Sequence, residues 1–272
     1  MREKGRLIEI GGRKVYCLSA GQGPPVFLLH GLGASSYSWR HVWPELAKSH
    51  CVHSIDWPGC GRSDKPMDFD YSPDGYTRTL LALMDRLEAR QAHLVGNSMG
   101  GVVSLFTALR HPERIASLTL VGTPTYPESR PGDLWALRWP VVGRLLEWSL
   151  GAWTVRWAAR QTFIDRSVIT AELVREYSAA LRSPGGRRAV AGFIRNAIPA
   201  DSQALIDSYP TMAHRTLILW GEKDCLVKRP SVERLASELP HSRLVMLAGC
   251  GHAPQEERPE DFNRALLEFL KL

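Results

Sequence analysis

Two periodicities of apolar residues alternate along the chain. Short, mostly apolar runs bounded by turn residues are typical of strands buried on both faces of a sheet. Between them lie stretches with the 3.6-residue apolar period of amphipathic helices. The predicted strands are 7–10, 15–18, 25–29, 52–55, 92–95, 116–121, 216–220 and 243–247. The predicted helices are 74–89, 99–110, 231–238 and 259–270.

The order of these elements predicts an α/β fold. The first two strands flank Gly11 and Gly12 and are typical of an antiparallel hairpin. The later strands are separated by helices, which favours a mostly parallel central sheet covered by helices on both faces.

Residues 125–208 interrupt this alternation. They contain no comparable strand, and apolar residues recur there at near-helical spacing. We therefore predict an α/β core formed by 1–124 and 209–272, with 125–208 inserted as a helical cap, or lid. The insertion is rich in tryptophan, which we expect to pack internally or to roof the active site. These tryptophans are Trp135, Trp139, Trp148, Trp153 and Trp157.

Composition is that of an ordinary globular protein. The chain has 272 residues, of which 44% are hydrophobic and 23% charged. No apolar run is long enough for a membrane span, and the first residues lack signal-peptide features, so we expect a cytoplasmic protein. The five scattered cysteines form no Cys-x-x-Cys pair and no ligand cluster has metal spacing, so we predict neither disulfides nor a metal or cofactor.

Positive charge is concentrated in one stretch. The net charge is +6, and residues 127–200 hold eleven arginines against six acids. No basic run resembles a nucleic-acid-binding arm, so we expect no nucleic-acid partner. An arginine-rich face is usually just solvated, but it could also attract an anionic substrate or an acidic carrier protein.

The hexapeptide 96–101, Gly-Asn-Ser-Met-Gly-Gly, is the strongest chemical signal. It joins a predicted strand to a predicted helix and matches Gly-x-Ser-x-Gly, in which a strained turn exposes a serine hydroxyl. Gly96 and Gly100 are needed where a Cβ would collide with neighbouring backbone. The pattern predicts Ser98 as a nucleophile.

A serine nucleophile needs a base and a group that orients the base. Asp224 and His252 each follow a late predicted strand, and the chain order Ser, Asp, His suits this architecture. His30 and the glycines behind it follow an early strand, where His30 is expected to hold the loop. The backbone N–H groups of Leu32 and Met99 are the predicted oxyanion-hole donors.

Together these segments resemble the α/β-hydrolase fold superfamily over essentially the whole chain. The resemblance implies a Ser98–His252–Asp224 triad, the two oxyanion-hole amides and a helical cap. Serine at position 98 also distinguishes the chain from haloalkane dehalogenases and epoxide hydrolases, which carry aspartate there. The motifs that carry the resemblance are 30–33, 56–64, 96–101, 220–224 and 251–252.

The resulting leading hypothesis is a carboxylic-ester hydrolase of the EC 3.1.1 type. It would act through an acyl-enzyme on a small ester with an apolar acyl part. The runner-up is a carbon–carbon hydrolase of meta-cleavage products, although these enzymes often carry Trp after the catalytic histidine, where this chain has Ala253. The same motifs are also compatible with a carrier-protein acyl ester hydrolase, a lactonase, a perhydrolase, an amidase and a non-catalytic receptor.

Overall fold

A central sheet of eight strands organises the molecule. The structure is a computed structural model that describes residues 4–127 and 140–271. In spatial order the strands are β1-β2-β4-β3-β5-β6-β7-β8. Their bounds are β1 Lys4–Ile10, β2 Arg13–Ala20, β3 Pro25–Leu29, β4 Cys51–Ile55, β5 Ala92–Asn97, β6 Ile115–Val121, β7 Thr216–Gly221 and β8 Ser242–Leu247.

Strand direction follows the predicted pattern. β1 and β2 form an antiparallel hairpin that closes between Ile10 and Arg13, and β2 pairs antiparallel with β4. Every other neighbouring pair in the sheet is parallel. The carboxyl ends of β3 to β8 therefore lie at one edge, where the loops that carry functional residues meet. The α/β fold class with a mostly parallel sheet is confirmed.

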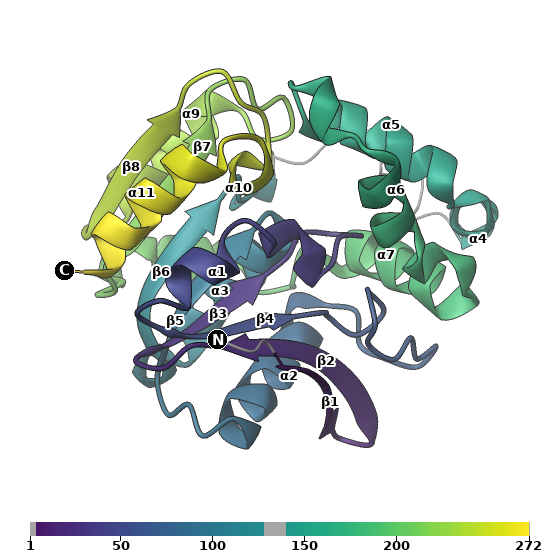
Figure 1. Cartoon of the computed structure of the whole chain (residues 1–272), viewed down its shortest axis with the longest axis horizontal. Helices are drawn as coiled ribbons and strands as arrows, with labels where there is room; N and C mark the ends of the chain where they lie inside the picture. Colours follow the sequence, from purple (N-terminus) through teal and green to yellow (C-terminus); the bar gives the residue numbers. More distant parts are fainter. Residues whose placement is uncertain (1–3, 128–139, 272) are drawn as a thin grey trace.

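Helices cover both faces of the sheet (Figure 1). The apolar residues of α2, α3 and α9 belong to one buried cluster, and those of α1 and α11 belong to another. The short helix α10 precedes α11. Their bounds are α1 Trp43–Leu46, α2 Pro73–Arg86, α3 Met99–Arg110, α9 Arg229–Glu238, α10 Pro254–Glu257 and α11 Pro259–Leu270.

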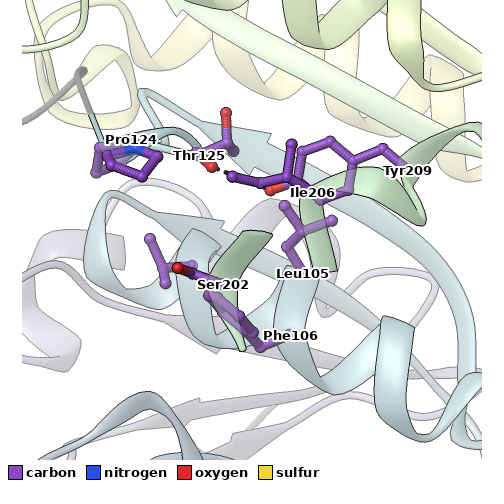
Figure 2. Close-up of a pocket in the computed structure, with 9 residues that line it drawn as sticks. Leu105, Phe106, Pro124, Thr125, Ser202, Ile206 and Tyr209 are labelled. Carbon is purple, nitrogen blue, oxygen red and sulfur yellow. Dashed lines mark hydrogen bonds between the residues drawn. The ribbon is translucent and has the colours of Figure 1, made fainter. Parts of the chain in front are cut away.

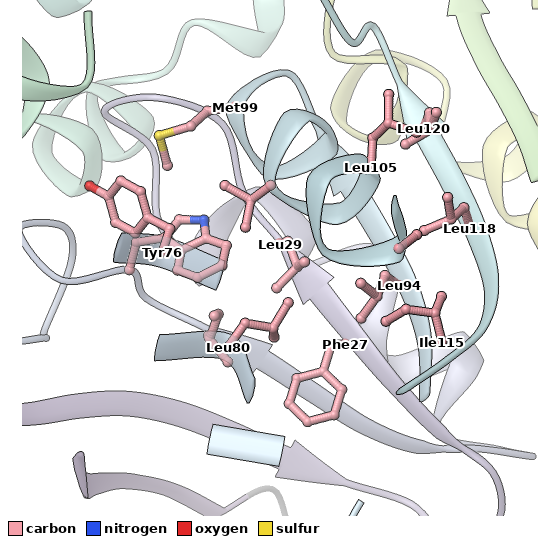
Figure 3. Close-up of a cluster of buried hydrophobic side chains, with 14 of the residues drawn as sticks. Phe27, Leu29, Tyr76, Leu80, Leu94, Met99, Leu105, Ile115, Leu118 and Leu120 are labelled. Atoms are coloured by element: carbon pink, nitrogen blue, oxygen red, sulfur yellow. The ribbon is translucent and has the colours of Figure 1, made fainter. Parts of the chain in front are cut away.

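The two clusters arise because successive side chains of a strand point to opposite faces. In β3, Phe27 and Leu29 belong to the cluster under α2 and α3, whereas Val26 and Leu28 belong to the cluster under α1 and α11. Figure 3 shows the first of these clusters, with Phe27 and Leu29 beside side chains of α2 and α3. A strand buried on both faces must be apolar throughout, which explains the continuous apolar runs of the sequence.

The segment between β6 and β7 is helical. Its described part contains α4 Pro140–Ser149, α5 Ala152–Thr162, α6 Ala171–Ser178, α7 Pro184–Asn196 and α8 Ser202–Asp207, and no strand. α5 packs on α6 and α4 packs on α7. Figure 1 shows α4 to α7 gathered to one side of the sheet. The helical character expected for this segment agrees with these elements.

The packing expected of its tryptophans is wrong for three of them. Trp148, Trp153 and Trp157 are 78%, 63% and 51% exposed. Trp135 and Trp139 lie outside the described residues. Within the described ranges, the helices are too short or too polar to cross a bilayer.

Candidate active site

Ser98 lies at the sharp turn between β5 and α3. Its φ of 51° and ψ of −113° fall in a region that a residue with a Cβ rarely adopts. Its N–H donates to the Val121 carbonyl at 2.8 Å, which ties the turn to the end of β6. The strained, half-buried serine is the arrangement that the hexapeptide predicts.

The glycines of this turn are required by contact. A Cβ on Gly96 would overlap the Gly100 backbone, and a Cβ on Gly100 would overlap the Leu29 carbonyl. A Cβ on Gly101 would overlap the Thr123 hydroxyl. An added Cβ would therefore collide at Gly96 and Gly100, as predicted. Because glycine has no Cβ, α3 can start directly against β3 and β5.

Asp224 and His252 meet as a hydrogen-bonded pair. Asp224 Oδ2 lies 2.8 Å from His252 Nδ1, and both side chains are buried. Asp224 Oδ1 accepts from the amides of Leu226 and Val227, at 2.8 and 3.0 Å. Because the carboxylate can only accept, Nδ1 carries the proton and Nε2 is left with its lone pair. A histidine held in this tautomer can act as a general base.

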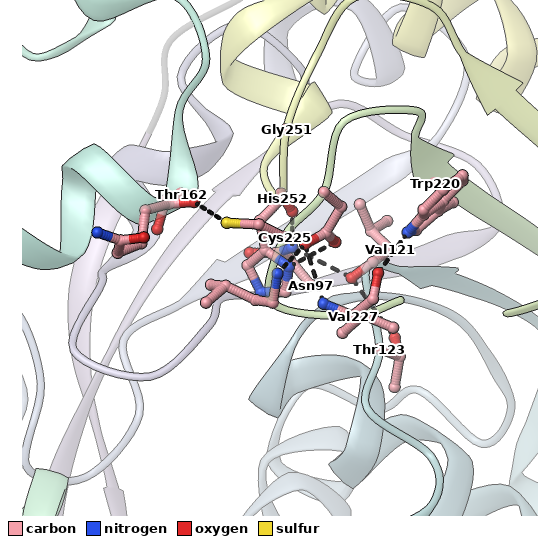
Figure 4. A network of polar contacts seen from close by, with 12 residues as sticks. Asn97, Val121, Thr123, Thr162, Trp220, Cys225, Val227, Gly251 and His252 are labelled. Carbon is pink, nitrogen blue, oxygen red and sulfur yellow. Dashed lines mark hydrogen bonds and ion pairs between the residues drawn. The ribbon is translucent and has the colours of Figure 1, made fainter. Parts of the chain in front are cut away.

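The turn with Ser98 and this pair are connected through Asn97. Its Nδ2 donates to the carbonyls of Val121 and His252, at 3.1 and 3.2 Å (Figure 4). The Ser98 hydroxyl makes no hydrogen bond within the described part of the chain, His252 included. In serine hydrolases the hydrogen bond between the serine and the histidine commonly tightens only once substrate is bound.

Two glycines lie against the candidate site: Gly122 beside the Asp224–His252 pair, and Gly31 beside Ser98. A Cβ on Gly122, which has a φ of +50°, would lie 3.0 Å from His252 Nδ1 and 3.2 Å from Asp224 Oδ2. A Cβ on Gly31 would lie 3.4 Å from the Ser98 Cβ. The loop after β3 therefore passes directly beside Ser98, as an oxyanion-hole loop must.

That loop is held by His30. Its Nδ1 donates to the Gly31 carbonyl at 2.8 Å, and its Nε2 accepts from the Trp57 amide at 3.1 Å. Burial lowers the pKa of His30, so the neutral form that makes both bonds is favoured. Both ring nitrogens are occupied, which fits the loop-holding role expected of His30.

Asp56, the first residue after β4, supports the same region. Its carboxylate accepts from the amides of Ser36 and Arg62, at 2.6 and 2.7 Å, and its carbonyl accepts from the Ser63 hydroxyl. These bonds join the oxyanion-hole loop to the Pro-Gly turn after β4.

The predicted oxyanion-hole amides find no acceptor in the part of the chain that the structure describes. Neither the Leu32 nor the Met99 N–H donates to any other described residue. Met99 is also the first residue of α3, where N–H groups lack intrahelical acceptors and favour negative charge. Two unpaired amides beside a serine can stabilise a developing oxyanion.

Glu257, which the sequence reasoning missed, anchors the His252 loop to the end of α5. Its carboxylate accepts from the amides of Gly251, Ile164 and Asp165, at 2.6, 2.7 and 2.8 Å. The His252 amide donates to the Thr162 carbonyl at 2.8 Å. The His252 loop is therefore positioned partly by the helical segment between β6 and β7.

Glu256 forms a second, fully buried link to that segment. It accepts from Arg40 at 2.6 Å, from Ser38 at 3.0 Å and from Tyr177 of α6 at 2.8 Å. Burial raises the pKa of Glu256, and these donors partly offset the rise. Sequence alone offers no signal for Glu256, Glu257 or Asn97, because their partners are remote along the chain.

A small apolar pocket lies near the start of α3 without including the predicted triad (Figure 2). Across it, the Tyr209 hydroxyl donates to the Thr125 carbonyl at 3.0 Å. Within residues 4–127 and 140–271, no three His, Cys, Asp or Glu side chains group as metal ligands. The pocket is lined by Val102, Leu105, Phe106, Pro124, Thr125, Pro127, Ser202, Ile206 and Tyr209.

Comparison with known proteins decides the family. The model of the alpha/beta hydrolase fold matches residues 24–259. The chain belongs to the α/β-hydrolase family. This match covers strands β3 to β8, the Ser98 turn and the His252 loop, so the expected resemblance is confirmed.

Several relatives that match over most of their length are hydrolases of a hydroxymuconate semialdehyde or of 2-hydroxy-6-oxo-dienoates. The chain is 31% identical to a 2-hydroxymuconate semialdehyde hydrolase of Pseudomonas sp., covering 98% of this chain and 94% of the relative. It is 31% identical to a 2-hydroxy-6-oxo-6-phenylhexa-2,4-dienoate hydrolase of Burkholderia cepacia, covering 94% and 91%. A solved meta-cleavage product hydrolase of Pseudomonas fluorescens is 29% identical and superposes with a TM-score of 0.82, covering 98% and 97%.

Proposed function

We propose that this α/β-hydrolase cleaves a carbon–carbon bond next to a ketone in a conjugated 2-hydroxy-6-oxo-dienoate. The observation that carries the proposal is the near-full-length similarity to two hydrolases of such compounds, the 2-hydroxy-6-oxo-2,4-heptadienoate and 2-hydroxy-6-oxo-6-phenylhexa-2,4-dienoate hydrolases. This similarity supports the runner-up of the sequence analysis better than it supports the ester hydrolase. The same relatives also support a more general conclusion, that the protein is a hydrolase of a small molecule.

In the proposed mechanism the dienol first tautomerises to its keto form, and Ser98 then attacks. His252 Nε2 removes the hydroxyl proton as Ser98 adds to the 6-oxo carbonyl, and Asp224 holds the imidazole and stabilises its charged form. The amides of Leu32 and Met99 stabilise the tetrahedral oxyanion. Collapse of this intermediate breaks the bond between C5 and C6 and leaves C6 as an acyl ester on Ser98. Water, activated by His252, then releases the acid.

A carbon leaving group needs a way to carry the electron pair of the broken bond. After the dienol has tautomerised to a 2-oxo-3-ene, with a proton added at C5, cleavage leaves the pair on C5. The pair is delocalised through the C3–C4 double bond to the 2-oxo oxygen, which gives a 2-hydroxy-dienoate after protonation. An ordinary ester needs no such delocalisation, so the two substrate classes test the proposal directly.

Ester hydrolysis remains the second candidate because of Ala253. The residue after His252 is small and buried, whereas meta-cleavage hydrolases often carry Trp there. The triad proposed above would also serve a carboxylic ester, because the first and last steps are the same. A bound apolar acyl part, as expected from the sequence, fits either substrate.

We also propose that residues 125–208 act as a cap on the core. Support comes from the hydrogen bonds that join Ile164, Asp165 and Tyr177 to the segment just after His252. Such contacts let the helical segment limit access to the base and choose the substrate.

The decisive experiment measures two substrates with one set of variants. Loss of dienolate absorbance on a 2-hydroxy-6-oxo-dienoate is expected to be faster, as kcat/KM, than release of p-nitrophenol from a short ester. Ser98→Ala is expected to lower both by about 10⁴-fold or more. The exposed Ser237→Ala on α9 is the matched control. Ester turnover without dienoate turnover would overturn the carbon–carbon assignment, and retained activity in Ser98→Ala would overturn the serine mechanism.

A further inference from the structure

Helices α4 and α5 present an exposed face in which indoles and guanidinium groups are mixed. Most of the exposed large apolar side chains in the described ranges lie between residues 145 and 164. Contiguous exposed apolar side chains mark a surface that meets a partner. We call this surface the tryptophan–arginine face. It consists of Arg144, Leu145, Trp148, Trp153, Arg156, Trp157 and Arg160.

On α5 the two residue types share one side of the helix. Trp153 and Trp157 are one turn apart, and Arg156 and Arg160 follow them by three residues each, so all four lie within a narrow arc. Ala159 lies farther round the helix, next to the edge of this arc, and is buried with Phe163, Leu173 and Ala253. α5 therefore buries one side against the protein and exposes two indoles on the side that faces solvent.

α4 continues this face. Arg144 and Trp148 are one turn apart, and Trp148 is 78% exposed. Arg187 of α7 lies 5.8 Å from the Trp148 ring and adds another cation beside it. The two helices are joined where Trp153 Nε1 donates to the Ser149 carbonyl at 2.8 Å.

Among the described residues, no ion pair neutralises the arginines of this face. The only acid between residues 140 and 164 is Glu147, which is buried, with its carboxylate 3.1 Å from Arg195. Arg144, Arg156 and Arg160 form no ion pair with any described residue. The face is therefore both apolar and cationic.

We propose that the tryptophan–arginine face docks on the surface of an anionic lipid bilayer. Indoles favour the zone between headgroups and acyl chains, where the ring is buried and Nε1 stays hydrated. Arginines interleaved with them meet the lipid phosphates. The core of a protein interface, by contrast, is depleted of charge, which makes an acidic protein the poorer fit.

The test is flotation of the whole protein with vesicles. Binding is expected to vesicles of phosphatidylcholine containing phosphatidylglycerol, and to weaken strongly with pure phosphatidylcholine or rising salt. Arg156→Gln with Arg160→Gln is expected to lower the partition coefficient about 30-fold, since each arginine near an anionic surface contributes about fivefold. Trp153→Ala with Trp157→Ala is expected to lower it about tenfold or more.

Matched controls separate this face from general charge and apolarity. Arg86→Gln with Arg90→Gln removes two exposed arginines at the same spacing, and Leu7→Ala with Met67→Ala removes two exposed apolar side chains. Both control pairs are expected to float like the unmodified protein, and melting temperatures identify any variant that fails to fold.

Three outcomes would overturn the proposal: no flotation with anionic vesicles, equal flotation with pure phosphatidylcholine, or equal loss in the controls and the face variants. Retention on an acidic carrier protein without flotation would assign the face to that partner class instead. None of these readouts depends on which substrate the active site cleaves.

Discussion

The sheet core and helices α4 and α5 differ in how far their tryptophan side chains are exposed. In the sheet core, three indoles are at most 2% exposed: Trp39, Trp57 and Trp220. In helices α4 and α5, three others are at least 51% exposed: Trp148, Trp153 and Trp157. The same residue type therefore serves internal packing in one region and faces outward in the other.

The same two regions also differ in whether their charged and polar side chains are paired. In the core, His30 and Asp56 use their polar atoms to hold the loop beside Ser98. In α4 and α5, three arginines are left without ion pairs to the described residues. The two regions meet at Glu256 and Glu257, next to His252. The core thus holds the loops around Ser98 and His252 in place, and α4 and α5 leave indoles and guanidinium groups exposed, with the His252 loop between the two regions.

The largest expected effect tests the core alone. Asp224→Asn keeps the shape of the pair but lets an amide donate toward Nδ1, which favours the wrong tautomer of His252. We expect kcat to fall by about 10⁴-fold. Asp207→Asn, an exposed residue of α8, is the control and should leave kcat unchanged. A comparable loss in both variants would contradict the assignment of Asp224.

The next largest effect is the loss of unfolding free energy when a buried tryptophan, rather than an exposed one, is replaced. Trp39→Ala removes a fully buried indole that packs on Phe262, and we expect it to cost about 3–5 kcal/mol of unfolding free energy. Trp157→Ala should change that free energy by about 0.5 kcal/mol or less. Urea unfolding followed by circular dichroism measures both. Similar losses in the two variants would show that Trp157 is packed.

Acid should destabilise the core through its histidines. All histidines lie outside residues 125–208. Burial lowers the pKa of His53 to about 4, from an ordinary value near 6.5. A histidine with a lowered folded-state pKa contributes stability above pH 6.5, and that contribution is lost as the pH falls toward 4.

We expect this loss to be about 3 kcal/mol. His53→Gln should flatten the dependence of the unfolding free energy on pH between 6.5 and 4. Exposed His241→Gln is the comparison and should leave the slope intact. An unchanged slope in His53→Gln would place the acid sensitivity elsewhere.

The smallest expected effect concerns the hydrogen bonds of Glu257, which join the core to the helical segment. Glu257→Ala removes the acceptor for the amides of Gly251, Ile164 and Asp165, so the His252 loop loses its attachment to α5. We expect kcat to fall about 100-fold with little change in KM, because a small displacement of a base is costly. Glu257→Gln keeps an accepting oxygen and should recover part of the rate.

Exposed Glu260→Ala, in the first turn of α11, is the control for this variant. Equal rates in Glu257→Ala and Glu257→Gln would mean that Glu257 does not position His252 through these bonds.

Most of the fold could be predicted because its signals are local. The apolar run at 25–29 coincides with β3, and the helical pattern at 259–270 coincides with α11. The helix predicted over 74–89 ends earlier, at Arg86, because Leu87 already leaves the helical conformation and Glu88 has a positive φ. Turn residues and periodicity identify elements well and their ends less well.

The candidate site was predictable only where a motif marks it. Ser98 was evident from its glycines, and Asp224 and His252 from their places after strands. Asn97, Glu256 and Glu257 were missed, because their roles depend on partners brought near by folding. Arg40 and Glu256, for example, are separated by 216 positions along the chain.

The sequence by itself determined the α/β class, the order of Ser98, Asp224 and His252, and the glycines that the Ser98 turn requires, because periodicity and backbone sterics act over a few residues. Only the tertiary structure decided that the Glu257 carboxylate ties the His252 loop to α5, and that Trp148, Trp153 and Trp157 face outward. Burial and long-range hydrogen bonds depend on which surfaces meet, and no local pattern encodes that.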